Sequence, residues 1–429
     1  MTYAALGRFF FPLVLTQLAL GFGGQFLNGG MARLPQAAQT LAVFGLAWGL
    51  TDFLVSPLSQ VRQLGLVLAQ GQAELRSLRR FVLLCCSVLM AALFALAESP
   101  LGDWVVGDLH GVSDSVALQV RWVLFAFIPL PLIAGINRLY SGVLIQFRRT
   151  DIVSVAMVAG MVVQIAAVLF LLPATWVQER PIALPVAAVY LGELVGLLIV
   201  LGGYAHCIHP FAGTGTGVGL DWAYVARFFW PLALVMAIQG LSRPLVNLFV
   251  SHQSDGVEAL AALAVVYALA HLPYGWLNEL RSIPAAFRNE GGQERILHFA
   301  VGCGLLSFSC MLLLFWTPLR SYILLDWIAV DRSLADRCVL PLMIFSFFPL
   351  AVSMRSYFNG MALVEHRTRA LAPSAPARVG AILLALMTFS RLEWEGATMG
   401  VAALFCGFVI ESLSVWFGVR IWPSWRKGN

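Results

Sequence analysis

Charged and amide side chains stand inside several long apolar stretches of this sequence, where they are costly unless they face a cavity or a partner. Gln239, Arg243 and Asn247 are spaced by four residues, so a helix places all three on one face. Arginine carries a permanent charge on a planar fork that matches carboxylate and phosphate groups. This face therefore predicts an anion-binding site.

A second polar group lies in the segment HLPYGWLNELR. Its polar residues fall at i, i+3, i+7 and i+10, and they are His271, Tyr274, Asn278 and Arg281. That spacing predicts one polar stripe along an otherwise apolar helix. Pro273 interrupts the helix, and the backbone groups that it frees tolerate exposure only beside a water-filled cavity. We therefore expect the stripe to line a cavity.

Three other apolar stretches contribute candidates to the same site. The first stretch carries Gln25 and Asn28 among several glycines, and Asn28 aligns with Asn247. Arg138 and Arg355 each lie inside a further apolar stretch. We assign these residues to substrate binding because an intramembrane charge usually faces a cavity.

Acidic residues are scarce inside the apolar stretches, where they comprise Asp52, Glu193, Glu279 and Glu411. A pocket for lipophilic cations would need such acids, so the arginine-rich inventory favours an anionic substrate. Coupling to an ion gradient is assigned to Asp52, Glu193, Glu279 and, as a proton carrier, His271. Glu411 is placed near a cytoplasmic helix end and left out of the site.

Simpler roles stay open for several of these residues. Arg243 can snorkel or hydrogen-bond to carbonyls loosened by Pro244. Arg281 can anchor the cytoplasmic end of its helix. His271 can be a packing residue, and Asp52 can form a hydrogen bond between packed helices.

Several classes of function are excluded or disfavoured. The only lysine is Lys427, so a P-loop for nucleotide hydrolysis is excluded. The seven cysteines show no metal-ligand spacing, and neither a metal nor a cofactor is expected. The net charge of +5 comes from short basic clusters between apolar runs, which indicates orientation in a bilayer rather than nucleic-acid binding. We expect no enzyme.

The elements that carry these residues are hydrophobic helices. Of the 429 residues, 60% are hydrophobic and 11% are charged, whereas soluble domains carry roughly 25% charged residues. A membrane-spanning helix needs roughly 20 apolar residues. The runs lie near 9–32, 41–69, 80–98, 118–146, 151–173, 182–204, 223–251, 257–286, 295–317, 337–364, 370–390 and 396–421. The sequence thus predicts an all-α integral membrane protein with twelve transmembrane helices.

The two halves of the chain repeat each other in the same orientation. RFFFPL at Arg8 returns as RFFWPL at Arg227, and LPLIAGINRLYSG is echoed by FPLAVSMRSYFNG, at an offset of about 220 residues. Parallel repeats are typical of secondary transporters with a pseudo-two-fold axis along the membrane normal. We predict six-helix bundles at 1–205 and 223–429, a cytoplasmic linker at 206–222 and, from the basic connectors, cytoplasmic termini.

Several long strings of this sequence are distinctive. They are WPLALVMAIQGLSRPLVNLFVS (230–251), HLPYGWLNELRSIPAAF (271–287), PLMIFSFFPLAVSMR (341–355), LAPSAPARV (371–379), EGATMGVAALFCGFVIES (395–412) and, more loosely, FGGQFLNGG (22–30) and LGLVLAQ (64–70). These strings resemble the progressive ankylosis (ANKH) family. The resemblance implies the fold of the multidrug/oligosaccharidyl-lipid/polysaccharide (MOP, MATE-like) exporter superfamily. It implies export of pyrophosphate, nucleoside triphosphates and citrate-like polycarboxylates. The matching positions are Gln25, Asn28, Ser242, Arg243, Asn247, His271, Tyr274, Glu279, Arg281 and Arg355.

The leading hypothesis is a monomeric secondary exporter of small polyanions in the cell membrane, working by alternating access between the bundles. One alternative is a flippase for an anionic lipid-linked precursor, which would use the same arginines for the head group. Another is a proton- or cation-coupled multidrug exporter driven through Asp52 or Glu193. The expected partners are a small anion and the lipid bilayer.

Overall fold

The helices of this chain fall into two sets, each with its own packing. The computed structural model describes residues 2–31, 33–108, 110, 113–207, 219–290, 292–328, 330–392 and 394–420, without the side chains of 19–25, 38 and 257. Within these ranges every regular element is helical. Unit 1 contains Met1–Phe10 and Trp230–Asn429, and unit 2 contains Phe11–Phe229.

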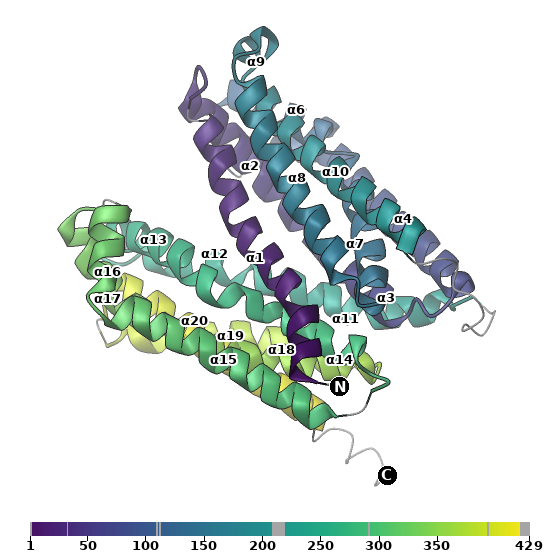
Figure 1. Ribbon diagram of the computed structural model, residues 1–429. Helices are drawn as coiled ribbons and strands as arrows, with labels where there is room; N and C mark the ends of the chain where they lie inside the picture. The colour runs from purple at the N-terminus through teal and green to yellow at the C-terminus, as the bar shows by residue number, and fades with distance from the viewer. Residues whose placement is uncertain are drawn as a thin grey trace. The chain divides into compact units, whose positions relative to one another are not determined.

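Unit 2 holds the first set of helices, drawn from purple to teal in Figure 1. They are α1 (Tyr3–Met31), α2 (Ala37–Val55), η1 (Ser56–Gln60), α3 (Val61–Val67), α4 (Gln72–Glu98), α5 (Pro100–Gly102), η2 (Asp103–Asp108), α6 (Asp114–Ala126), α7 (Leu130–Gln146), α8 (Thr150–Leu171), α9 (Thr175–Glu179) and α10 (Ala183–Cys207). The first residues of α1 belong to unit 1. α7 packs against α3, α4 and α10, and α8 lies along α10.

Unit 1 holds the second set, drawn from teal to yellow. They are α11 (Trp222–Gly240), α12 (Ser242–Ser251), α13 (Gly256–Gly275), η3 (Trp276–Ser282), α14 (Ile283–Ala286), α15 (Gln293–Trp316), α16 (Leu319–Ser321), η4 (Tyr322–Trp327), α17 (Arg332–Phe345), α18 (Phe348–Val364), η5 (Thr368–Leu371), α19 (Ser374–Ser390) and α20 (Gly396–Arg420). The start of α11 belongs to unit 2. α20 packs against α12, α13, α17, α18 and α19.

The hydrophobic helices account for the predicted spans. In the described part of the chain, ten helices are long and apolar enough to cross a membrane. α6 and α7, which meet at a bend of 42°, are long and apolar enough only as a pair and make an eleventh span if the two are counted together. The remaining hydrophobic segment is α1, in which Tyr3–Leu18, the part before the undescribed side chains of 19–25, forms a shorter apolar helix. A helix satisfies its own backbone hydrogen bonds, which lipid cannot do, so apolar runs of this length fold as helices.

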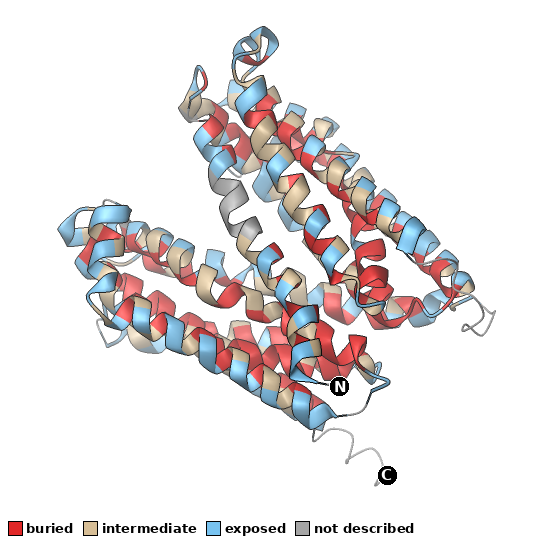
Figure 2. Cartoon of the chain, in the orientation of Figure 1, coloured by how far each residue is buried: buried red, intermediate tan, exposed pale blue. Residues whose placement is uncertain are grey.

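Burial is uneven among the helices of unit 1, as the colours of Figure 2 show. Among the candidate spans, Arg332–Val364 and Gly396–Arg420 are the most buried. Their aromatic residues form a core in which the rings of Phe345 and Phe348 stack at 4.2 Å between centroids. Phe348 also contacts Phe408 of α20 at 4.9 Å. This core holds α17, α18 and α20 in one arrangement.

The predicted repeat is visible in backbone details of each unit. Arg148 follows α7 with a φ of 59°, and His366 follows α18 with a φ of 53°, at an offset of 218 residues. A Cβ at Gly142 would clash with the carbonyl oxygen of Arg62, and a Cβ at Gly360 would lie 2.7 Å from that of Arg281. Both glycines are therefore required for the same close approach between helices.

The predicted bundle boundaries stay predictions. The predicted linker at 206–222 falls mostly on residues 208–218, which lie outside the described residues. The compact units divide the chain at other places, after Phe10 and after Phe229, inside the hydrophobic helices α1 and α11.

Candidate functional site

The first predicted polar face lies on either side of a helix break. α11 ends at Gly240 and α12 begins at Ser242, close to Pro244, which fits the first turn of a helix because it lacks an N–H group. Arg243 is exposed, with its guanidinium 4.9 Å from the centre of the Tyr267 ring. Ser242 is fully buried. Of the predicted face, Arg243 is thus the charged group open to a ligand.

The second predicted stripe is not a continuous one, and that expectation is wrong. α13 ends at Gly275, and the chain continues as the 3-10 helix η3, in which the 3.6-residue period is lost. The carbonyl oxygen of Pro273 accepts hydrogen bonds from Trp276 Nε1 at 2.7 Å and from Ser307 Oγ at 2.6 Å. Side chains thus supply the hydrogen bonds for this backbone carbonyl at the point where the helix changes its pitch.

The residues of that stripe consequently meet different surroundings. His271 is exposed and packs edge-on against Tyr274 at 5.3 Å between centroids. Tyr274 and Glu279 are buried, and Arg281 is half-buried. Asn278 points into the bundle, where it contacts α18.

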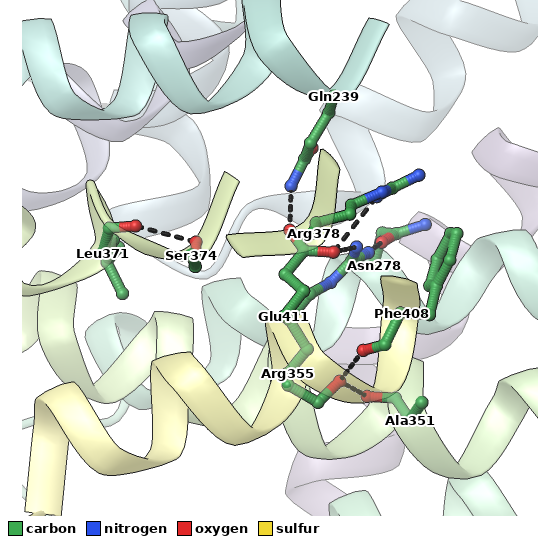
Figure 3. Close-up of polar contacts among 10 residues, drawn as sticks. Gln239, Asn278, Ala351, Arg355, Leu371, Ser374, Arg378, Phe408 and Glu411 are labelled. Atoms are coloured by element: carbon green, nitrogen blue, oxygen red, sulfur yellow. Dashed lines mark hydrogen bonds and ion pairs between the residues drawn. The ribbon is translucent and has the colours of Figure 1, made fainter. Parts of the chain in front are cut away.

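An ion cluster in unit 1 brings together side chains of α11, η3, α18, α19 and α20 (Figure 3). Arg355 of α18 and Arg378 of α19 donate through Nη1 to Oε2 of Glu411 in α20, at 2.8 Å and 3.0 Å. Oε1 of Glu411 accepts a hydrogen bond from Gln239 Nε2. Arg355 Nη2 donates to Asn278 Oδ1 at 2.6 Å, and Asn278 Nδ2 donates to the carbonyl oxygen of Gly275 at 2.9 Å. These five side chains are called the arginine cluster below.

The helices hold the arginine cluster in place by separate contacts. α18 begins at Phe348 and carries Pro349 in its first turn, where the missing N–H group of proline costs no hydrogen bond. Ser412 Oγ, next to Glu411 in α20, donates to the carbonyl oxygen of Ala351 at 2.8 Å. The same hydroxyl lies 2.7 Å from the carbonyl oxygen of Phe408, so it bridges α18 and α20 beside the ion pair. The carbonyl groups of Ala351 and Phe408 are drawn in Figure 3.

The charges of the arginine cluster are buried and do not balance. The side chains of Arg355, Arg378 and Glu411 are 9%, 7% and 1% exposed. The Phe408 ring lies 5.2 Å from the Arg355 guanidinium and 4.1 Å from that of Arg378, which gives both cations a favourable aromatic face. Two guanidinium groups and one carboxylate leave a net positive charge, which attracts an anion.

Arg378 and Glu411 were missed by the sequence analysis. Glu411 does not lie at a helix end but is buried inside the bundle, with both oxygens hydrogen-bonded. The repeat held a signal for it, because Glu411 and Glu193 occupy the last helix of each half at an offset of 218 residues. At the same offset, Asn137 corresponds to Arg355 and Gly160 to Arg378.

The positions of unit 2 that correspond to the arginine cluster of unit 1 border a cavity instead. The cavity measures about 370 Å³, and its polar lining residues are Asn28, Asn137, Gln164 and Glu193. Gly160 and Gly192 form part of its wall and let α8 and α10 approach closely. Among the residues that the structure describes, no basic side chain lines it. The corresponding positions of the two units thus differ in charge.

The other predicted residues of unit 2 lie outside this cavity or are not described. Arg138 and Asp52 are both exposed, and the charge of Arg138 acts on Asp52. Neither residue lines the cavity. The side chain of Gln25 is among those that the structure does not describe. Among the described residues, no three His, Cys, Asp or Glu side chains are grouped to hold a metal ion.

Comparisons with known proteins agree with this architecture. The model of the progressive ankylosis protein (ANKH) family matches residues 1–298. A mutant of the Vibrio cholerae MATE transporter VcmN superposes with a TM-score of 0.75 and 14% identity, covering 99% of this chain and 97% of that one. An outward-facing multidrug resistance MATE transporter of the MOP superfamily gives 0.73 and 14%, covering 99% and 95%.

A third similar structure is a MOP superfamily transporter from Pyrococcus furiosus, with a TM-score of 0.71 and 13% identity, covering 99% of this chain and 95% of that one. At such identities the likeness establishes the fold. The predicted all-helical, MATE-like membrane fold is therefore confirmed.

Proposed function

Because this chain belongs to the progressive ankylosis protein family, we propose that it is a secondary transporter that exports small polyanions by alternating access between its two bundles. The cargo class comprises pyrophosphate, nucleoside triphosphates, citrate and related polycarboxylates. Each of these molecules carries several carboxylate or phosphate groups, and arginine binds both kinds through its planar fork.

The observation that carries this proposal is the excess of positive charge in unit 1. Arg355 and Arg378 converge on Glu411, so that two guanidinium groups share one carboxylate. Arg243 adds an exposed guanidinium, which lies over the Tyr267 ring and whose charge acts on Tyr274. The Pyrococcus furiosus transporter is described as having a binding pocket of reverse polarity, so one fold can host pockets of different charge.

Flux measurements in proteoliposomes test the site. Arg243→Gln, Arg355→Gln and Arg378→Gln should each lower pyrophosphate or citrate efflux about tenfold or more, because each removes a charge that contacts the anion. Arg337→Gln is the matched control, since Arg337 pairs with Asp255 at 3.0 Å elsewhere in the same unit. Unchanged efflux in all three variants would show that the site is wrongly assigned.

A second candidate function is cation-coupled drug export, which the cavity of unit 2 favours. Glu193 lines that cavity, where the described lining residues include no basic side chain, and Asp52 offers a further carboxylate in unit 2. This function predicts that Glu193→Gln or Asp52→Asn abolishes resistance to cationic drugs in cells. Under the leading proposal the protein exports no drugs. Cells with the wild type, with either variant and without the protein should then be equally sensitive to the drugs.

The proposed setting is the cell membrane, with both termini in the cytoplasm and a monomer as the working unit. A two-bundle transporter has both halves of its machinery in one chain. Protease cleavage of terminal tags in sealed vesicles of known orientation tests the topology.

A further inference from the structure

The arginine cluster already contains an anion, which is the carboxylate of Glu411. Its Oε2 accepts hydrogen bonds from Arg355 and Arg378, and its Oε1 accepts one from Gln239. With both oxygens engaged and 1% of the side chain exposed, Glu411 occupies the place that a substrate carboxylate or phosphate would take. A substrate can therefore take the Nη1 donors of both arginines only if Glu411 gives up its contacts.

Displacement of Glu411 has an electrostatic consequence. A carboxylate that loses two guanidinium partners inside a bundle stays ionised only at a large desolvation cost. Taking up a proton removes that cost, because the neutral acid is far less sensitive to burial. Ionised Glu411 and the bound anion thus compete for the same positive charge.

Resting on the function proposed above, we propose that the anionic substrate replaces Glu411 on Arg355 and Arg378, and that Glu411 binds one proton as it is displaced. Each bound anion is then accompanied by one proton. When the anion leaves, Glu411 gives up the proton and returns to the arginines. The chemistry identifies the co-transported ion as H⁺ and the substrate as a carboxylate or phosphate anion.

The charged groups around Glu411 are few, which makes the coupling specific. Arg355 comes from α18 and Arg378 from α19, while α11 contributes the neutral Gln239. From α13, Tyr274 lies close enough for its charge state to interact with both arginines, and His271 packs on Tyr274.

The other elements that pack on α20 place their charges elsewhere. On α12, Arg243 lies over Tyr267 and its charge acts on Tyr274. Arg337 of α17 pairs with Asp255, and the same carboxylate accepts a hydrogen bond from the backbone N–H of Gly396 at the start of α20. Gly396 is separated from Glu411 by about 22 Å along the helix, at about 1.5 Å per residue. On η5, Arg369 is exposed. Glu411 is thus the group that a proton neutralises when the arginines are taken by another anion.

Isothermal titration calorimetry tests the coupling on the full-length purified protein. The probe is citrate at about pH 8, where all its carboxyl groups are ionised, in buffers of different ionisation enthalpy. The wild type should take up about one proton per citrate bound, and its affinity should fall about tenfold per pH unit as the pH rises. Glu411→Gln should bind citrate more tightly and take up no proton.

Two further variants keep the test decisive. Glu411→Asp retains a carboxylate and should retain the proton uptake, even if its affinity differs. Glu365→Gln changes a glutamate whose arginine partner, Arg367, lies at 3.2 Å near the end of α18, and it should behave as the wild type. Citrate binding by the wild type without proton uptake, or uptake that persists in Glu411→Gln, overturns the coupling and leaves the anion site standing. Absence of binding by citrate and by pyrophosphate overturns both.

Discussion

Arg355 and Glu411 lie 56 residues apart in the sequence, yet Arg355 Nη1 donates to Glu411 Oε2 at 2.8 Å inside unit 1. Neither residue is more than 9% exposed at its side chain. Charges buried to this degree are kept only where they are paired, and here one carboxylate serves two guanidinium groups. The pair therefore supports the packing of α18 on α20 and is the basis of the proposed anion site.

Removal of the carboxylate should destabilise the protein strongly. Glu411→Ala leaves Arg355 and Arg378 buried without a counterion, which typically costs about 3–5 kcal/mol. Glu365→Ala breaks an exposed pair with Arg367 and should change the free energy of unfolding by less than about 1 kcal/mol. Unfolding in detergent, followed by tryptophan fluorescence, compares the two. Equal losses of unfolding free energy would mean that the buried ion pair stabilises the protein no more than the exposed one.

Arginine at position 355 should not be replaceable by lysine. Arg355 uses Nη1 for Glu411 and Nη2 for Asn278 at the same time, whereas the single ammonium of lysine lacks this planar fork. We expect Arg355→Lys to lower anion efflux about tenfold, which corresponds to about 1.4 kcal/mol. Arg337→Lys, which replaces a single contact to Asp255, should leave efflux near the wild-type rate. Assays of anion efflux from proteoliposomes compare both variants with the wild type.

The glycine at position 360 should be irreplaceable for packing. A Cβ there would lie 2.7 Å from the carbonyl oxygen of Arg281 and 2.8 Å from Pro284 Cγ, so α18 and η3 would have to separate. Gly360→Ala should cost about 1–3 kcal/mol. Gly302→Ala in α15 adds a methyl group in open space and should stabilise the helix by about 0.5–1 kcal/mol. Thermal unfolding of both variants gives the comparison, and a stable Gly360→Ala would contradict the structure.

A pH effect is expected from His366, which lies in the turn between two spans. His366 is exposed, but partial desolvation of its ring, helped by the positive charge of Arg288, lowers the pKa of this imidazole below 6.5. Its contribution to stability is therefore fully present above about pH 6.5 and is lost as the pH falls toward the lowered folded-state pKa. His366→Gln should lose less stability between neutral and mildly acidic pH. Parallel unfolding curves for both proteins across that range would contradict the expectation.

The same residue tests the backbone of the turn. His366 has a φ of 53°, a left-handed conformation that favours glycine. We expect His366→Gly to raise the midpoint of thermal unfolding at neutral pH, because it relieves that strain. A fall in the midpoint would show that the contacts of the imidazole outweigh the backbone term.

The sequence by itself determined the membrane class, the helical segments and the repeat. Apolar runs long enough to span a bilayer have no stable alternative to the helix, because lipid offers no hydrogen bonds to the backbone. The duplication is equally legible, since the repeated strings keep their order and spacing. Arg355 was also recognised, because a charge inside an apolar run is conspicuous.

Only the tertiary structure decided which of the polar residues meet. Glu411 contacts Arg378 and Gln239, which lie 33 and 172 residues away, and helical periodicity says nothing about which faces of distant helices pack together. The change to a 3-10 helix after Gly275 likewise turned Asn278 toward Arg355, against the spacing expected for a continuous helix. The local period is a property of the sequence, but the partner of each charge is set by how the helices pack.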